Sequence, residues 1–405
     1  MKNSCERTGK RTVNKKALIE KMSGVLSAVN RILPKNPKKI VFYSNMGFRD
    51  NVKAVYDEVI ARDCREYRII CAVSDWEDFQ KRPHPDNVRF VSPAGGVRHF
   101  FTGKYFFYSF GKYPVKPSKK QMVVNLWHGS PLKTIGNYND DKDENFFTYV
   151  LAASDFFVPI MQKAFGCRPE QVKVCGHPRN DAMFRGENAL AKLGLDGGWD
   201  KLILWMPTFR QSEFLGVSDA AKTEGTGLPI LTDKADMERV NGLLREKNAL
   251  LLAKIHPAQD LDAIDRTAYS NIRIVTNRQM QEARCDLYAL LGQAHGLITD
   301  YSSVYFDYLL LDRPIGFTVD DLEEYMANRG FVVDDPRTLM PGPLLRTPED
   351  FREFLADLLE GRDPYGEERL RVKKLTNQYD DGKDSARALA LAGLDLPARE
   401  KEETL

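Results

Sequence analysis

Several familiar signatures are missing from this sequence, and each absence argues against a class of protein. There is no G-x-x-x-x-G-K-[ST] segment, which argues against a P-loop ATPase, and no G-x-G-x-x-G at the first strand turn. The six cysteines form no C-x-x-C pair, so in a chain of 405 residues they indicate reduced thiols rather than a disulfide framework. The cysteine pattern therefore favours a cytosolic protein.

Long apolar runs and a large charge of one sign are also lacking. No stretch approaches the ~18 uninterrupted apolar residues that predict a membrane-spanning helix. The N-terminus is basic but has neither the apolar block nor the cleavage site of a signal peptide. With a net charge of only +2, the chain has no overall basic field to attract nucleic acid. We therefore expect a protein that stays inside the cell and does not bind nucleic acid.

What the sequence does contain is a basic N-terminal arm over residues 1–37. Up to residue 39 the chain carries eleven Lys or Arg against two Glu. Between residues 15 and 33, apolar residues recur at intervals of three and four, which predicts a helix with one apolar stripe flanked by basic side chains. Such a helix either lies on an anionic membrane surface or packs on its own domain. The sequence leaves both readings open.

Beyond the arm, the chain alternates between apolar strands and helices. This rhythm predicts an α/β fold with parallel sheets. A helical and then Gly-rich stretch after residue 181 separates two strand series. We therefore expect one Rossmann-like domain at 38–190 and a second at 191–350, followed by C-terminal helices and a tail at 351–405. A length of 405 residues suits two such domains.

Several predicted strands end in unusual polar residues. In parallel α/β sheets, ligands bind outside the carboxyl ends of the strands. The polar ends are the runs 127–130 (WHGS), 176–181 (GHPRND), 207–210 (PTFR), 254–257 (KIHP) and 300–303 (DYSS). Because two sheets supply these runs, we expect them to line one crevice.

The run DYSS stands where a new helix begins. Helix N-termini present unpaired N–H groups and serine adds a hydroxyl, so Ser302 and Ser303 suit a phosphate. Asp307, one turn further on, is placed to reach a ribose or polyol hydroxyl. The alternative is that serine serves here only as a helix cap. The five polar strand ends together favour a phosphate-rich ligand.

Two histidines at strand ends are candidates for the chemistry. A neutral imidazole at His128, between Trp127 and Gly129, is placed to take a proton from an acceptor hydroxyl. His256, from the second sheet, is placed to donate to a phosphate oxygen. An Asp-x-Asp run within residues 140–145 resembles a divalent-ion site, but such a polar loop is more often only solvated. We therefore expect no metal and no other cofactor.

These loops resemble the CDP-glycerol glycerophosphotransferase family, the teichoic acid primases and polymerases. The matching runs are NLWHGSPLKTIG, GHPRND, MPTFR, KIHP and LITDYSSVYFDYLLLDRPIGF, together with VFYSNMGFRDNVKAVY at the first strand and helix. Several motifs occur in the right order, which makes the resemblance specific. One departure is His177, where the family more often has Tyr.

The resemblance implies a GT-B-like fold, in which two Rossmann-like domains face a central cleft. It implies CDP-glycerol or a similar CDP-polyol as donor, bound by the domain at 191–350, and an acceptor on the domain at 38–190. The acceptor of this family is lipid-linked. The resemblance therefore also implies a cytoplasmic protein attached peripherally to the inner face of the cell membrane.

Carried over residue by residue, the resemblance makes His128 the base, with His256 as a second catalytic residue. The residues expected to bind substrate are Gly129, Ser130, Pro131, Arg179, Thr208, Arg210, Asp300, Ser302, Ser303 and Asp307. Three other functions stay open. They are a transferase that uses CDP-ribitol, a GT-B glycosyltransferase that uses a nucleotide sugar, and a scaffold that binds membrane or nucleic acid through the basic arm.

Overall fold

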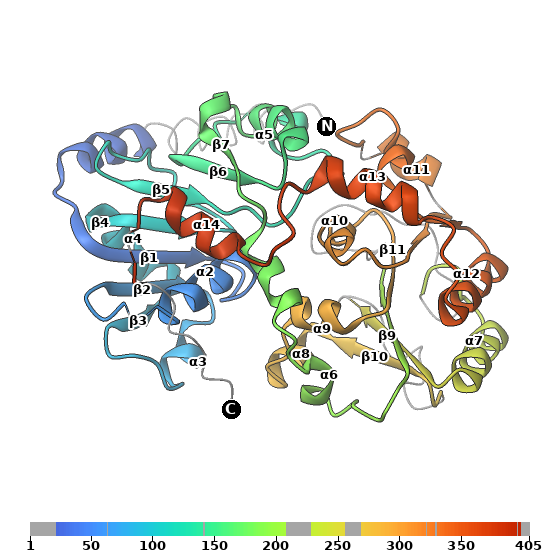
Figure 1. Ribbon diagram of the computed structural model, residues 1–405. Helices are drawn as coiled ribbons and strands as arrows, with labels where there is room; N and C mark the ends of the chain where they lie inside the picture. The colour runs from blue at the N-terminus through green and yellow to red at the C-terminus, as the bar shows by residue number, and fades with distance from the viewer. Residues whose placement is uncertain are drawn as a thin grey trace, which may run out of the picture.

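The computed structural model describes residues 22–62, 64–140, 142–207, 228–255, 269–320, 322–328, 330–394 and 396–397. Within these ranges the chain forms two α/β domains, each built on a parallel sheet (Figure 1). The prediction of an α/β protein with two Rossmann-like, parallel-sheet domains is therefore confirmed.

The first domain is built on a seven-stranded sheet in the order β3-β2-β1-β4-β5-β6-β7. Its strands are β1 (Asn36–Ser44), β2 (Arg68–Val73), β3 (Val88–Val91), β4 (Gly103–Tyr108), β5 (Met122–Asn125), β6 (Tyr149–Ala152) and β7 (Val172–Val174). All neighbouring strands run parallel. Strand β1 is buried from Lys39 to Ser44, because helices cover both faces of the sheet.

The second domain is built on a six-stranded parallel sheet in the order β10-β9-β8-β11-β12-β13. Its strands are β8 (Lys201–Met206), β9 (Ala249–Ile255), β10 (Ile272–Thr276), β11 (Gly296–Thr299), β12 (Ile315–Thr318) and β13 (Leu344–Leu345). In both sheets the strand order reverses beside the first strand of the domain, between β1 and β4 and between β8 and β11. Such switch points are where doubly wound sheets bind ligands.

Helices connect the strands and cover the sheets. In the first part of the chain they are α2 (Asp50–Ile60), α3 (Trp76–Gln80), α4 (Pro93–Thr102), α5 (Val158–Phe165) and α6 (Ala189–Lys192). In the second part they are α7 (Lys234–Glu246), α8 (Asn277–Glu282), α9 (Leu287–Gln293), α10 (Val304–Tyr308), α11 (Leu322–Asn328), α12 (Pro348–Glu360), α13 (Gly366–Thr376) and α14 (Asp384–Leu391). Local signals fix several starts. For example, the hydroxyl of Thr347 accepts the Asp350 N–H at the start of α12.

The last helix crosses back to the first domain. Helix α12 packs beside the second sheet, whereas α14 contacts α2 and the 3-10 helix η4 (Pro178–Phe184) of the first domain (Figure 1). The carboxylate of Asp181 accepts the N–H groups of Asp384 and Ser385 at 2.8 and 2.9 Å. The segment that we expected as one C-terminal unit, 351–405, therefore divides between the two domains.

Residues 22–32 form a helix whose polar side faces the first domain. Asn30 is buried, and its amide donates to the Lys116 carbonyl at 3.0 Å and to Gln121 Oε1 at 2.6 Å. Ser27 Oγ accepts the Lys116 N–H at 2.9 Å. The apolar stripe is exposed: Met22, Val25, Val29 and Ile32 are 54%, 60%, 39% and 82% exposed. The helix does pack on its own domain, through Ser27 and Asn30 and through Leu26, the stripe residue that packs against the core.

None of the helices in the described ranges is long and apolar enough to cross a membrane. Five of the cysteines lie in these ranges, and all five are free. Burial raises the pKa of Cys167 and of Cys285 to about 11, so both thiols stay protonated at neutral pH. The described cysteines thus fit the prediction of reduced thiols.

Candidate functional site

The loops at the carboxyl ends of the two sheets meet where the domains touch. A β-carbon built on Gly129 would lie 3.0 Å from Ser303 Oγ, so the loop after β5 reaches the start of α10. The same loop bonds the second domain through its backbone, where the Val332 N–H donates to the Leu132 carbonyl at 2.9 Å. The tandem serines and the histidine loop therefore share one interdomain surface.

His128 lies in this loop and stacks on two aromatic rings. Its ring centroid is 4.9 Å from that of Phe110 and 3.9 Å from that of Trp127. The side chain is half-buried. Burial lowers the pKa of His128 to about 4, although the carboxylate of Asp50 opposes this shift. The imidazole is therefore neutral at pH 7 and able to accept a proton.

The backbone on both sides of His128 is in the left-handed region. The φ angle is +55° at Trp127 and +122° at Gly129. A positive φ in a non-glycine residue costs about 1–3 kcal/mol and persists only where the surroundings impose it. Asn51 supplies part of that support, because its amide donates to the carbonyls of Leu126 and Trp127 at 3.1 and 3.0 Å. The fold thus holds the loop in one strained conformation that presents His128.

Arg179 joins the two domains through buried ion pairs. It lies in η4, directly after β7, and its guanidinium donates to Asp50 Oδ2 and to Asp307 Oδ2, both at 2.7 Å. A further bond runs from Nη1 to the His128 carbonyl at 2.9 Å. Burial opposes the charged form, but the two carboxylates outweigh it and raise the pKa of Arg179. The charged guanidinium therefore ties the backbone of the histidine loop to the second domain.

Asp307 already has protein donors on both of its oxygens. Oδ2 accepts from Arg179 and from the Tyr288 hydroxyl at 3.0 Å, and Oδ1 accepts from the Asn180 amide at 3.1 Å. Arg179 is 6% exposed and Asp307 is 0% exposed. We expected both residues to contact the donor, and the structure shows that they contact each other. Their contact with a ligand stays a prediction.

Ser130 and Pro131 are buried as part of the same loop. Ser130 Oγ lies 3.2 Å from His177 Nε2. Burial lowers the pKa of His177 to about 4, so this ring is neutral at pH 7. Its Nδ1 has no hydrogen-bond partner within the described ranges. Ser130 therefore helps to anchor the loop, and substrate contacts of Ser130 and Pro131 stay predictions.

Ser302 and Ser303 lie half-exposed between β11 and α10. Ser303 is the N-cap residue of α10, yet its hydroxyl makes no capping hydrogen bond. The hydroxyl is thus not engaged in the role that serine most often has at this position. The phosphate contacts of Ser302 and Ser303 stay predictions. Asp300, just before the serines, is buried with 1% exposure.

Three predicted residues, Thr208, Arg210 and His256, lie outside the described residues. Strands β8 and β9 end at Met206 and Ile255, just before them, and these strands are neighbours in the second sheet. The roles assigned to the three residues stay predictions.

The sequence reasoning missed Asp50, Asn51, Phe110 and Tyr288. The first two had a signal, because the polar run FRDN follows the first strand just as the other polar runs follow theirs. Phe110 follows β4, and Tyr288 lies within α9. Neither aromatic residue gave a signal, since aromatic residues are common in buried strands and helices.

The acidic loop at residues 140–145 holds ion pairs with lysines. In the described part of the loop, Asp140, Asp143 and Glu144 pair with Lys142, Lys116 and Lys112. Among the residues that the structure describes, no group of three or more His, Cys, Asp or Glu is arranged to hold a metal ion. The described carboxylates of this loop are thus partnered by cationic side chains.

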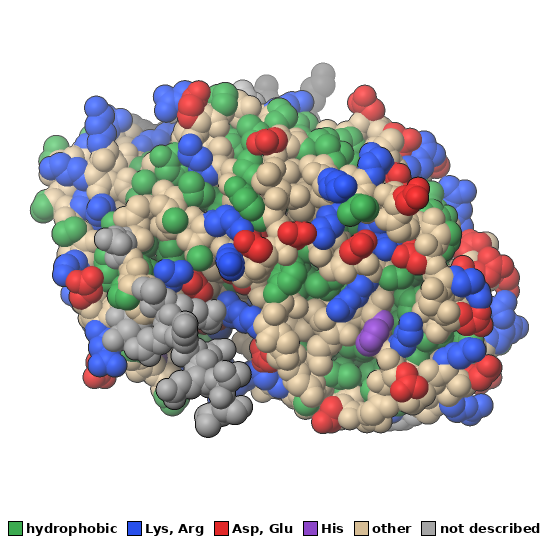
Figure 2. All heavy atoms as spheres, viewed as in Figure 1, with side chains coloured by type: hydrophobic (Ala, Val, Ile, Leu, Met, Phe, Trp, Pro, Cys, Tyr) green, Lys and Arg blue, Asp and Glu red, His purple; other side chains and the backbone are tan. Residues whose placement is uncertain are grey.

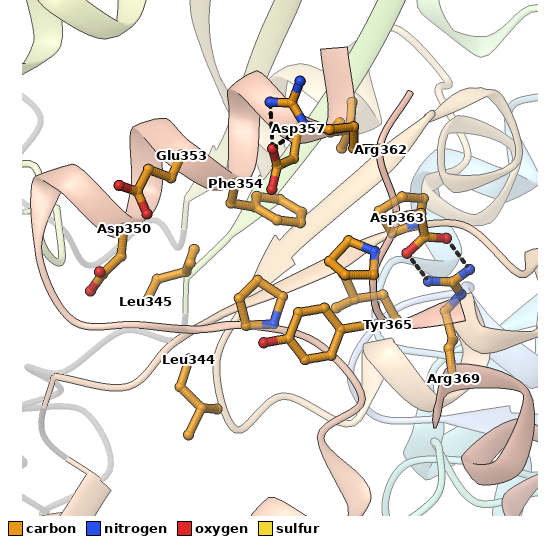
Figure 3. A pocket seen from close by; sticks show the side chains of 15 residues that line it. Leu344, Leu345, Asp350, Glu353, Phe354, Asp357, Arg362, Asp363, Tyr365 and Arg369 are labelled. Atoms are coloured by element: carbon orange, nitrogen blue, oxygen red, sulfur yellow. Dashed lines mark hydrogen bonds and ion pairs between the residues drawn. The ribbon is translucent and has the colours of Figure 1, made fainter. Parts of the chain in front are cut away.

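A pocket in the second domain lies apart from the interdomain loops (Figure 3). It lies beside β12 and β13, against α12 and α13, and its walls include Leu344, Phe354 and Tyr365. Its carboxylates are Asp350, Glu353, Asp357 and Asp363, of which Asp357 pairs with Arg362 and Asp363 with Arg369. A wall so rich in carboxylates repels a diphosphate. The interdomain loops are therefore the better candidate for a nucleotide donor.

Two Rossmann-like domains that meet at their carboxyl-end loops are the architecture of GT-B transferases. Solved structures of the wall teichoic acid polymerase TagF have this fold. One superposes with a TM-score of 0.73 at 22% identity and covers 97% of this chain and 96% of that chain. A second, soaked with CDPG, gives a TM-score of 0.74 at 22% identity, with 96% of each chain covered. At this identity the likeness shows the fold.

The family itself follows from the sequence match. The profile of the CDP-Glycerol:Poly(glycerophosphate) glycerophosphotransferase family matches residues 25–391, and the chain belongs to this family. The chain is 27% identical over 376 residues to the teichoic acid poly(glycerol phosphate) polymerase of Bacillus spizizenii, covering 84% of this chain and 88% of that protein. The prediction of a CDP-glycerol glycerophosphotransferase of teichoic acid synthesis is therefore confirmed.

Relatives named for ribitol phosphate are also similar. The teichoic acid ribitol-phosphate primase of Bacillus spizizenii is 26% identical over 312 residues, which cover 69% of this chain and 71% of that protein. The ribitol-phosphate polymerase TarL of Staphylococcus aureus is 26% identical, and the chain spans only 48% of its length. Membership of the family thus leaves the choice of polyol to be argued separately.

Proposed function

We propose that the chain transfers glycerol phosphate from CDP-glycerol to a hydroxyl of a lipid-linked saccharide or polyol phosphate chain, releasing CMP. The observation that carries this proposal is the position of the neutral His128. It lies in a first-domain loop that touches Ser303, at the start of α10 in the second domain. A proton acceptor and a candidate phosphate site thus border one surface.

In the proposed reaction, His128 takes the proton of the acceptor hydroxyl. The acceptor oxygen forms a bond to the phosphorus that bears the glycerol, and the bond from this phosphorus to the bridging oxygen breaks. The bridging oxygen leaves on CMP with the electron pair. Phosphoryl transfer depends mainly on positioning and on charge stabilisation. The strained loop around His128 and the start of α10 supply the positioning.

The low pKa of His128 belongs to the chain without ligand. A phosphate close to an imidazole favours its protonated form and raises its pKa. The donor therefore brings the basicity of His128 closer to the range in which a general base works best. Binding of the donor and activation of the base are thus coupled.

The test combines a donor comparison with a variant of the base. Mass spectrometry of a synthetic lipid-linked acceptor, after incubation with CDP-glycerol or CDP-ribitol, gives the donor and the number of units added. We expect additions from CDP-glycerol, and in His128→Ala we expect turnover to fall by about 100-fold or more with CDP-glycerol binding retained. His84→Ala is the matched control, because half-buried His84 lies in the loop before β3, at the amino-end edge of the first sheet and away from the carboxyl-end loops. Unchanged turnover in His128→Ala would remove this residue as the base.

Two other donors are distinguished by the CDP-ribitol incubation and by a parallel incubation with a nucleotide sugar. Additions from CDP-ribitol alone would establish the ribitol alternative, which the similarity to the ribitol-phosphate primase supports. Release of UDP or CDP from a nucleotide sugar would instead indicate a glycosyltransferase. The mass added to the acceptor and the nucleotide released together identify the donor.

The exposed stripe of the helix at 22–32 supports a peripheral contact with the cytoplasmic face of the membrane. Met22, Val25, Val29 and Ile32 form an apolar face whose side chains stay 39–82% exposed in the described part of the chain. A cationic side chain lies at the same helix, since Lys35 Nζ donates to the Asn30 carbonyl at 2.9 Å. An apolar stripe beside basic groups suits the boundary of an anionic lipid surface.

Sedimentation with vesicles tests this contact. We expect the protein to bind vesicles that contain phosphatidylglycerol and to lose this binding in Val25→Ser/Ile32→Ser. Leu370→Ser is the matched control, because Leu370 is an exposed apolar residue of α13, in the second domain. Equal vesicle binding by all three proteins would contradict the assignment to the helix at 22–32.

A further inference from the structure

Two cationic side chains, one from each domain, stand at the carboxyl-end edges of the two sheets, where the domains meet. Arg49 lies in the loop after β1, directly before α2, and Lys254 lies near the carboxyl end of β9. Lys254 is half-buried and stands one residue before the carboxyl end of β9, at the edge of the second sheet that faces the interdomain loops. Burial lowers its pKa, and the charge of Arg49 adds to this shift.

Arg49 is also connected to the proposed base through an aromatic ring. Its guanidinium carbon lies 5.9 Å from the ring centroid of Phe110, and this ring stacks on His128. Arg49 follows β1 and Phe110 follows β4, so both stand at the switch point of the first sheet. The two cations therefore border the surface at which donor and acceptor must meet.

Neither Arg49 nor Lys254 has a carboxylate partner within the described ranges. Arg179, close to the same surface, is neutralised by Asp50 and Asp307. Asp50 is adjacent to Arg49 in the chain but is committed to Arg179. Like charges repel, although water screens part of this repulsion because Arg49 is exposed. Such an arrangement is favourable once a ligand anion lies between the charges.

We propose that Arg49 and Lys254 form a clamp for the diphosphate of the donor nucleotide, with one cation from each domain. This inference rests on the proposed function, because it takes a cytidine diphosphate ester as the ligand. During transfer, the bridging oxygen keeps the electron pair of the broken bond and gains negative charge on CMP. A cation on each side stabilises this charge and holds the two domains together while it develops.

Calorimetric titration with CDP and CMP tests the clamp without turnover. Lys254→Met and Arg49→Met remove one charge each, and we expect each to lower the affinity for CDP by about 10- to 100-fold. Cytidine, which lacks phosphate, should compete equally well in all variants. Lys247→Met is the matched control, because Lys247 lies after α7 in the same domain and pairs with Glu360. It should leave CDP affinity unchanged.

Proton uptake provides a readout that a purely structural lysine would not change. Lys254 has a pKa of about 8 without ligand. Among the charged groups in the described ranges, Arg49 is the one that shifts the pKa of Lys254. On the neighbouring strand β10, the residue opposite Lys254 is the uncharged Val275. A bound phosphate raises this pKa, so CDP binding at a pH near or above this value should be accompanied by proton uptake. Titrations in two buffers of different ionisation enthalpy measure the uptake.

The clamp is overturned if Lys254→Met and Arg49→Met bind CDP as the wild-type protein does, or if proton uptake persists in Lys254→Met. Lys254→Arg should keep most of the affinity and lose the uptake, which separates loss of charge from misfolding. Wild-type protein that binds CDP with uptake but releases no CMP from CDP-glycerol would refute the proposed function and leave the clamp standing. Wild-type protein that turns over CDP-glycerol but takes up no proton on CDP binding would refute the clamp and leave the proposed function standing.

Discussion

Replacing Asp307 by Asn tests whether its buried ion pair with Arg179 holds the two domains together. The change keeps the shape of the side chain, removes its charge and turns one oxygen into a donor. In the structure, Oδ2 accepts from Arg179 and Tyr288, and Oδ1 accepts from Asn180. The new amide must therefore face at least one N–H or O–H donor. We expect Asp307→Asn to destabilise the folded chain.

The magnitude follows from the partners that remain. Removing one member of a buried ion pair costs about 3–5 kcal/mol, because the other charge is left uncompensated. Two features place the cost of Asp307→Asn at the lower end of this range. Arg179 keeps Asp50, and the Asn180 amide, whose Oδ1 has no partner within the described ranges, can turn to accept from the new amide. A loss of about 3 kcal/mol lowers Tm by about 6–12 °C for a folding unit of about 150–250 residues.

Differential scanning calorimetry measures this change. Asp335→Asn is the matched control, since Asp335 pairs with Arg337 at 2.8 Å on the exposed surface and exposed pairs contribute little. Its Tm should stay close to the wild-type value. An Asp307→Asn protein with wild-type Tm and weakened CDP-glycerol binding would refute the reasoning. It would show that Asp307 is the donor contact that the family resemblance implies.

Three further predictions follow from single observations. The buried His177 has a pKa of about 4 and titrates near 6.5 in the unfolded chain. The free energy of unfolding, measured by urea titration, should therefore fall as the pH is lowered from 6.5 to 4. In His177→Phe this fall with pH should be smaller. Gly129→Ala should lower both Tm and turnover, because φ is +122° and the added carbon would lie 2.4 Å from Arg179 Nη2; Gly198→Ala, with a positive φ but open space, should cost less. Turnover should persist in excess EDTA, and full loss that Mg²⁺ restores would contradict a metal-independent mechanism.

Much of the fold could be predicted from the sequence, because each strand is a short apolar run. Strand β1 is predicted by IVFYS and β9 by ALLLAKI, both of which are buried along most of their length. The polar runs that end such strands indicated one common surface, since the carboxyl ends of parallel strands lie at the same edge of a sheet. His128 and Ser303 could therefore be brought together before any coordinates, and the contact of Gly129 with Ser303 agrees with this.

The rest could not be predicted, because a pattern does not say which face of an element meets which partner. The stripe at 22–32 has the helical period, but that period is equally compatible with burial and with exposure. The outcome depends on Ser27 and Asn30, whose polar atoms find partners in the first domain. The position of Asp307, one turn after the serines, likewise suggested a ligand contact. Only the packing of η4 against the second domain shows that the Asp307 carboxylate binds Arg179.

The two groups of charges at the domain boundary suggest how structural and functional cations differ in this protein. Arg179 is buried with its charge fully matched by Asp50 and Asp307, so a further anion there would meet two carboxylates and be repelled. Arg49 and Lys254 are matched by no carboxylate in the described ranges, so an anion gains attraction from both. The donor phosphates should therefore lie toward Arg49 and Lys254, with Arg179 acting on them only through the backbone of the loop that carries His128.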